Sequence, residues 1–203
     1  MFGQSPMKYV IFKEQVADRF GIGSQDVRIV GSARLGFSPS PNQNKFGKPF
    51  SETSDVDVVI VSEALFHHGS RELFRQLNQL GPTLNQIRIN GKAPIVDLKD
   101  WRVMKEAVRN YVYQNFNPGL LDNENPLKQD IFSKISSTAG LFLALEPKVF
   151  VSRIRCRVFR DWRAAENYYT NSIRELSKFL EGAEEVDVDT DDELEKQVEP
   201  KSV

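Results

Sequence analysis

The chain has 203 residues, of which 40% are hydrophobic and 27% are charged, a composition typical of one globular domain with a sizeable core. Its apolar runs are far shorter than the roughly 20 residues of a membrane helix, so we expect no membrane association. The N-terminus lacks a basic-then-apolar signal pattern, and the single cysteine, Cys156, excludes an internal disulfide. These features predict a cytoplasmic protein.

The net charge of -1 hides a strong asymmetry along the chain. Residues 181–203 hold ten acids against two bases, whereas residues 1–180 hold 25 bases against 18 acids. A mildly basic body suits a polyanionic ligand such as a nucleotide, although bases that only solvate helices would give the same balance. The organisation we expect is a single domain over 1–180, followed by an acidic disordered tail over 181–203.

The first elements expected are a helix over 5–20, which Gly21 ends, and a short strand over 27–30 that runs into a glycine-serine turn. The segment 37–53 then reads as a loop or a hairpin, because it is rich in Pro, Ser, Asn and Gly. Its length is unusual for a connection without structure of its own. The length of this segment is equally compatible with a loop that takes part in function and with a surface loop that has no functional role.

The stretch 55–61, with the sequence DVDVVIV, predicts a strand that carries two carboxylates. Side chains two residues apart in a strand point to the same face, so Asp55 and Asp57 project together while the intervening valines face the other way. Two adjacent carboxylates repel each other unless a cation lies between them. Because both ligands are oxygens, the pattern favours Mg²⁺ or Mn²⁺ over zinc.

The rest of the chain alternates between helical and strand patterns. Helices are expected over 63–80, 101–116, 131–145 and 161–180, and strands over 85–90, 92–100 and 149–158. This order predicts an α+β (α/β) fold with a small mixed sheet flanked by helices and a C-terminal helical region, and not a doubly wound parallel sheet.

A third acid stands out in the predicted strand 92–100. Asp97 lies at its centre between apolar residues, where an unpaired charge is costly. A glycine before a serine at a strand-to-helix turn lets a phosphate approach the backbone, and the Ser32 hydroxyl can donate to its oxygens. Metal-assisted phosphoryl chemistry needs a further carboxylate beside the first two, and Asp97 is the candidate for it.

Together these motifs resemble the DNA polymerase beta-like nucleotidyltransferase superfamily. The resemblance covers about residues 25–100 and is carried by Gly31-Ser32 with the following Arg34 and Gly36, and by Asp55-Val56-Asp57 on an apolar strand. It implies metal-dependent transfer of a nucleoside monophosphate from an NTP to a hydroxyl, with release of pyrophosphate. The gap of 22 residues between Ser32 and Asp55 is about twice that of small members, and it makes the loop unusual.

The resemblance implies a role for each motif residue. Asp55, Asp57 and Asp97 would hold Mg²⁺ or Mn²⁺ as the catalytic acids, and Gly31, Ser32 and Arg34 would contact the nucleotide. We add to the nucleotide site Lys45 and Lys48, which lie in the loop between the two halves of the motif. A basic strand face is formed by Arg153, Arg155 and Arg157, which either meets the acceptor or is simply solvated.

Two functions follow from this reading. The first is an enzyme whose acceptor is a protein, an RNA, a small molecule or another nucleotide. Small bacterial members of the superfamily often serve in defence or toxin–antitoxin systems, which is an analogy from fold alone. The second is a catalytically inactive module on the same fold that senses a nucleotide or docks on RNA or a protein partner.

Overall fold

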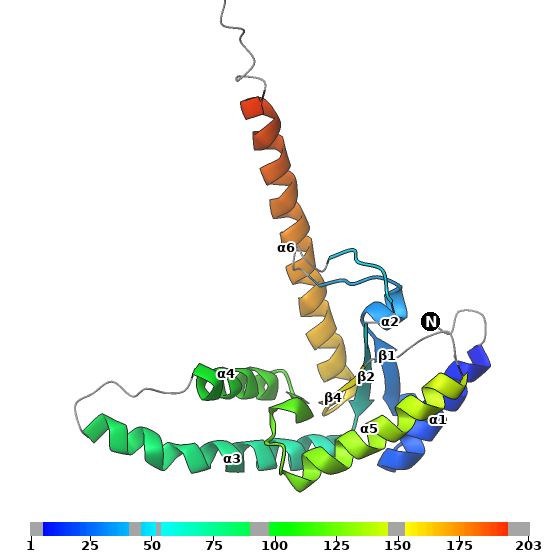
Figure 1. Ribbon diagram of the computed structural model, residues 1–203, viewed down its shortest axis with the longest axis vertical. Helices are drawn as coiled ribbons and strands as arrows, with labels where there is room; N and C mark the ends of the chain where they lie inside the picture. Colours follow the sequence, from blue (N-terminus) through cyan, green and yellow to red (C-terminus); the bar gives the residue numbers. More distant parts are fainter. Residues whose placement is uncertain (1–5, 41–45, 52–53, 90–97, 146–152, 195–203) are drawn as a thin grey trace, which may run out of the picture.

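The computed structural model describes residues 6–40, 46–51, 54–89, 98–145 and 153–194 (Figure 1). These residues form a mixed α+β fold with one four-stranded sheet and flanking helices, which confirms the predicted class. The helices are α1 (Pro6–Phe20), α2 (Ser32–Leu35), α3 (Glu63–Ile89), α4 (Leu98–Val112), α5 (Pro126–Leu145) and α6 (Trp162–Leu194). The strands are β1 (Val27–Val30), β2 (Asp55–Val61), β3 (Asn115–Phe116) and β4 (Arg153–Phe159), with 3₁₀ turns at η1 (Ser24–Asp26) and η2 (Pro118–Leu120).

The sheet has the strand order β1-β2-β4-β3 and is mixed. β1 runs antiparallel to β2, β2 runs parallel to β4, and β3 runs antiparallel to β4. A parallel pair cannot be joined by a tight turn, and here α3, α4 and α5 lie on the long connection between β2 and β4. In the resulting register Asp57 lies between Val30 on β1 and Arg155 on β4, so these three residues share one face of the sheet.

The main hydrophobic core lies on the opposite face of the sheet. There the alternating apolar residues of β1, β2 and β4, such as Ile29, Val58 and Ile154, are buried against three helices. The buried contributions from those helices are Phe12 and Val16 of α1, Phe66 and Leu73 of α3, and Ile131 and Ile135 of α5. Alternation in the first part of β2 and along β4 therefore separates a buried apolar face from a face that carries charge, and the second face becomes apolar toward Val59 and Phe159.

The charged face is partly covered by the beginning of α6. The Asp161 carboxylate accepts a hydrogen bond from the Ala164 amide at 2.8 Å, which caps the helix and lowers the pKa of that carboxyl. Ala164 and Ala165 then pack on Val59 and Phe159 of the sheet. Beyond this contact α6 rises away from the body (Figure 1).

Several predicted elements differ from the structure. α3 continues through Gly81-Pro82 to Ile89, so the predicted strand over 85–90 is wrong. An alternation that short cannot be told from a helix segment by periodicity alone. α4 begins at Leu98, inside the predicted strand 92–100. Residues 92–97 of that strand, including Asp97, lie outside the described residues.

The C-terminal helix is also longer than expected. α6 runs to Leu194, into the acidic segment predicted to be disordered, and residues 195–203 lie outside the described part. The first residues of that segment, Glu181 to Glu185, are mostly good helix formers, which favours continuation of the helix. Among the described helices, none is long and apolar enough to span a membrane.

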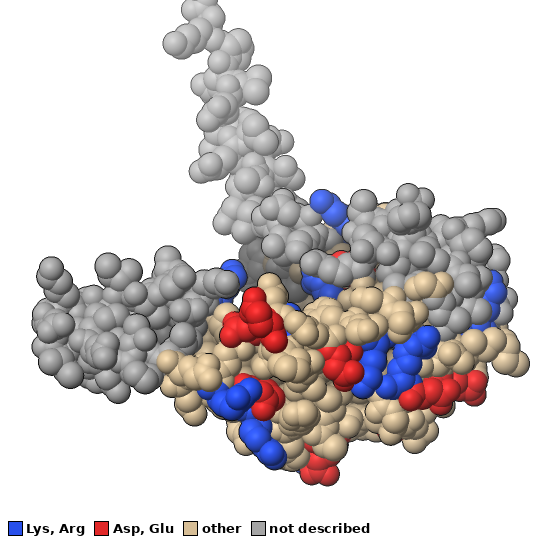
Figure 2. Space-filling view, turned by 60° about the horizontal axis from the view of Figure 1, so that its bottom comes forward, with Lys and Arg blue, Asp and Glu red and all other residues tan. Residues whose placement is uncertain are grey.

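On one face of the body, positive side chains lie among negative ones (Figure 2). On the face shown in Figure 2, basic and acidic side chains lie beside one another and are not gathered into one field. Exposed ion pairs on the helices, such as Arg75–Glu72 at 2.6 Å on α3 and Lys134–Asp130 at 2.7 Å on α5, balance part of it. Part of the basic excess therefore solvates helices, which was the simpler of the two interpretations of composition.

Cys156 of β4 should be a slow-reacting thiol. It packs against the main core, and burial raises the pKa of the Cys156 thiol to about 12, against a smaller opposing effect of the Arg157 guanidinium. Because the thiolate is the reactive form, we expect alkylation at pH 8 to be slower by more than about tenfold in the native protein than in urea. Iodoacetamide labelling followed by mass spectrometry measures both rates. Equal rates would contradict the burial of this sulfur.

Candidate active site

The glycine turn after β1 lies directly against the second acid of β2. Gly31 has φ 66° and ψ -150°, a left-handed conformation that side-chain-bearing residues rarely adopt. A Cβ atom added to Gly31 would lie 2.8 Å from Oδ2 of Asp57. The two halves of the motif therefore meet in the fold, although Gly31 and Asp57 are 26 positions apart in the sequence, and a side chain at position 31 would require Asp57 to shift.

A short helix follows this turn and carries the remaining motif residues. Ser32 is the first residue of α2, and the Arg34 amide donates to the Gly31 carbonyl at 3.0 Å. Gly36 ends the helix in a left-handed conformation with φ 87°. Ser32 is half-buried beside the turn, whereas Arg34 is exposed. The geometry thus places a hydroxyl next to Gly31 and an exposed guanidinium one helical turn away.

The two acids of β2 differ in their surroundings. Asp55 lies near the start of the strand, where its side chain is 23% exposed. Asp57 lies deeper, and burial raises the pKa of its carboxyl. The Arg155 guanidinium opposes this rise, Asp55 adds to it, and Arg157 opposes it more weakly. Asp57 is therefore a carboxylate held at a cost in free energy, which a bound cation would relieve.

Arg155 forms an ion pair with the first acid. Its Nη2 lies 2.6 Å from Oδ2 of Asp55, and it is the register partner of Asp57 on β2. The sequence left open whether Arg155 meets an acceptor or is simply solvated. In the structure its guanidinium contacts Asp55, one of the candidate metal ligands. Arg153 is the register partner of Asp55, so all three arginines lie on the strand next to the acids.

Arg157 is held in place by residues that the sequence did not indicate. Its Nη1 donates to Asn115 Oδ1 at 2.8 Å and to Asn110 Oδ1 at 3.3 Å, and its guanidinium lies 4.8 Å from the centre of the Tyr168 ring. Both asparagines are buried, and their amide nitrogens have no partner within the described residues. The only signal in the sequence was the presence of asparagine among the apolar residues of α4 and β3.

The loop over residues 37–53 contacts α6 through an aromatic pair. Phe37 and Pro49 form an isolated antiparallel bridge, and the Ser38 amide donates to the Lys48 carbonyl at 2.8 Å, so the described ends of the loop pair as in a hairpin. The Phe46 ring lies 6.0 Å from the Phe179 ring of α6. Lys48 is exposed, and Lys45 lies outside the described residues. The loop therefore lies beside α6, near α2 (Figure 1).

The donors fit part of a magnesium site. Two carboxylates on one strand face supply hard oxygen ligands, and Mg²⁺ in proteins commonly takes one or two carboxylates, with waters and substrate phosphates completing its octahedron. Within the described residues, no group of three or more His, Cys, Asp or Glu side chains could hold a metal. The candidate third acid, Asp97, lies outside those residues.

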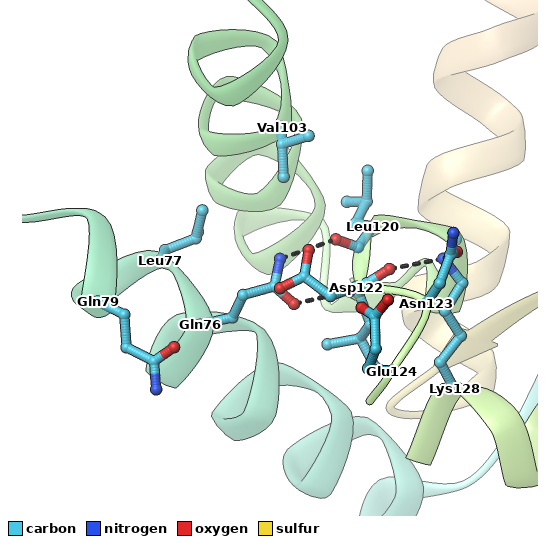
Figure 3. Close-up of a pocket in the computed structure, with 11 residues that line it drawn as sticks. Gln76, Leu77, Gln79, Val103, Leu120, Asp122, Asn123, Glu124 and Lys128 are labelled. Atoms are coloured by element: carbon cyan, nitrogen blue, oxygen red, sulfur yellow. Dashed lines mark hydrogen bonds between the residues drawn. The ribbon is translucent and has the colours of Figure 1, made fainter. Parts of the chain in front are cut away.

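A separate hollow of about 470 Å³ lies away from the acids (Figure 3). It is bounded by α3, α4 and the turn after η2, and no described residue of β2 or β4 lines it. Gln76 spans it, because its Nε2 donates to the Leu120 carbonyl at 3.3 Å and its Oε1 accepts from the Asp122 amide at 2.8 Å. These bonds tie α3 to the turn, so Gln76 has a structural role in the wall of the hollow.

Comparison of the chain with protein-family models, with curated proteins and with solved structures found no match.

Proposed function

We propose that this chain is a metal-dependent nucleotidyltransferase of the DNA polymerase beta-like type. One observation carries the proposal: the Gly31 turn approaches the Asp57 carboxylate so closely that a Cβ atom would lie 2.8 Å from it. A phosphate-binding turn and a pair of carboxylates are the two parts that phosphoryl transfer requires within reach of each other.

The chain's own residues would act in distinct ways. Asp55 and Asp57 would hold Mg²⁺ or Mn²⁺, which when bound neutralises triphosphate charge and lowers the pKa of an acceptor hydroxyl. The Ser32 hydroxyl and the amides after Gly31 would donate to phosphate oxygens, and Lys48 would supply a mobile positive charge. The acceptor hydroxyl would lose its proton to solvent and its oxygen would form a bond to the α-phosphorus. The bond from that phosphorus to the α,β-bridging oxygen would break, and pyrophosphate would leave.

Label transfer tests this function directly. The protein is incubated with each of the four α-labelled NTPs and Mg²⁺ or Mn²⁺, alone and with candidate acceptors that include RNA, proteins of a cell extract and free nucleotides. We expect label to move to an acceptor with release of pyrophosphate, and Asp55→Asn to abolish the transfer. Asp130→Asn, which removes an exposed acid on α5, is the matched control and should retain activity. The absence of label transfer with every NTP and every acceptor would contradict the proposed nucleotidyltransferase activity.

A second function is supported by the ion pair between Asp55 and Arg155. A guanidinium already neutralises one of the two acids, and no third acid joins them within the described residues. This arrangement suits a protein that binds a nucleotide without turning it over. If titration calorimetry shows NTP binding while no label moves in the transfer assay, the sensing module replaces the enzyme.

A further inference from the structure

The acid site contains a cation that belongs to the chain itself. Arg155 Nη2 lies 2.6 Å from Asp55 Oδ2, and Arg155 faces Asp57 across the strand pair. A guanidinium on Asp55 competes with a divalent metal for that carboxylate, because both are drawn to the same oxygen lone pairs and their positive charges repel each other. In the structure the guanidinium of Arg155 therefore contacts a carboxylate that a bound metal would need as a ligand.

The two neighbouring arginines differ in their freedom to move. Arg157 is bound by two buried asparagines and lies over the Tyr168 ring, so its position is set by three residues. The Arg155 side chain, by contrast, is 56% exposed, and its long stem can swing without disturbing the core. Solvent reaches the Arg155 end of the pair and screens its charge, although the Asp55 side chain is only 23% exposed, and this screening lowers the free energy that opposes the movement.

We propose that Arg155 couples metal binding to triphosphate binding. In the metal-free protein the Arg155 guanidinium occupies Asp55. When a nucleotide binds, the guanidinium transfers to a phosphate oxygen, and its positive charge no longer opposes a metal at the Asp55 carboxylate. This inference rests on the proposed function and adds an order of events to it: the site holds a divalent cation well only when a triphosphate is present.

Electrostatics favours such an exchange. Phosphate oxygens accept two parallel bonds from a guanidinium, and these charge-assisted bonds match or exceed a single bond to a carboxylate. A positive charge at Asp55 repels an incoming divalent ion, and removal of that charge to the triphosphate reverses the effect. By linkage, the nucleotide must raise metal affinity by the same factor as the metal raises nucleotide affinity.

Binding of Mn²⁺, followed by electron paramagnetic resonance, tests the inference without any turnover. We expect Arg155→Gln to bind Mn²⁺ alone about three- to tenfold more tightly than the wild type, as expected from the loss of a weak ion pair and one positive charge. A non-hydrolysable ATP analogue should tighten Mn²⁺ binding by the wild type, and by a smaller factor in Arg155→Gln. Complexation of Mn²⁺ by the analogue is measured in protein-free samples.

Two further variants complete the design. Arg155→Lys keeps the charge and should stay close to the wild type. Arg163→Gln removes an exposed charge from α6 and is the matched control, with no expected change in Mn²⁺ affinity. Thermal melts establish that all variants fold.

Two outcomes separate this inference from the function on which it rests. If the wild type and Arg155→Gln bind Mn²⁺ equally and respond equally to the analogue, Arg155 is not the coupling residue, while the metal site stands. If neither protein binds Mn²⁺ with or without the analogue, or if Asp57→Asn leaves the affinity unchanged in both backgrounds, the acids do not hold a metal and the proposed function fails with the inference.

Discussion

Asp57→Asn is expected to abolish nucleotidyl transfer and, at neutral pH, to raise the melting temperature. The loss of activity should be at least about a hundredfold, because removal of even an outer-shell partner of a metal ligand costs about 10–100-fold. The gain in stability has a separate cause. Burial is the largest influence on the Asp57 carboxyl and raises its pKa above the ordinary value, so the ionised form destabilises the folded state.

The sign of the pH dependence follows from this raised pKa. The contribution of Asp57 to stability is fully present below the unfolded pKa of about 3.9 and is lost as the pH rises through the higher folded pKa. The Asp57→Asn variant has no carboxyl to ionise at this position, so it does not lose this stability as the pH rises. The difference in melting temperature between variant and wild type should therefore be greatest near pH 7 and should vanish below about pH 4. Calorimetry across this range measures it.

Asp55→Asn provides the comparison. It should also lose transfer, but it breaks the ion pair with Arg155 and is not expected to raise the melting temperature. A variant at position 57 that melts below the wild type at pH 7 would mean that its partners, Arg155 and Arg157, outweigh burial. An active Asp57→Asn protein would remove this residue from the mechanism.

Gly31→Ala is expected to lower both stability and activity. The backbone at Gly31, with φ 66° and ψ -150°, costs a residue with a side chain about 1–3 kcal/mol, and the new methyl group would lie 2.8 Å from Asp57 Oδ2. In a chain of this size each kcal/mol lowers the melting temperature by about 2–4 °C. Displacement of Asp57 by about 1 Å would reduce transfer by about a hundredfold.

Gly36→Ala is the matched control for this change. Gly36 also has positive φ, at 87°, but a Cβ atom there would meet nothing within 4 Å. It should show backbone strain without displacement of the acid. Melting temperatures and transfer rates of the two variants separate the two effects. Equal rates in both would indicate that the close approach to Asp57 has no part in catalysis.

Local patterns were sufficient to predict the two halves of the site. The alternation in DVDVVIV predicted β2 and the shared face of Asp55 and Asp57, and the apolar residues of α1 predicted its helix almost to the residue. These signals are reliable because periodicity within one element depends only on neighbouring residues and on which face is buried.

Contacts between distant segments were beyond that reasoning. The sequence favoured a basic strand over 149–158 but did not say which strand it would join. In the structure β4 lies parallel to β2 and brings Arg155 opposite Asp57. Similarly, Asn110 and Asn115 were unremarkable until the fold brought them to Arg157. A parallel partner joins from far along the chain, and no local periodicity encodes which strand it will be.

The sequence by itself therefore determined the chemistry that is available, namely a glycine-serine turn, two carboxylates on one strand face and a basic strand. Residue type and alternation suffice for this, because they set what a side chain can bind and which way it points. Only the tertiary structure decided what each group meets. Strand order and register placed the Gly31 turn against Asp57 and the guanidinium of Arg155 on Asp55, since these contacts depend on pairing between segments far apart in the chain.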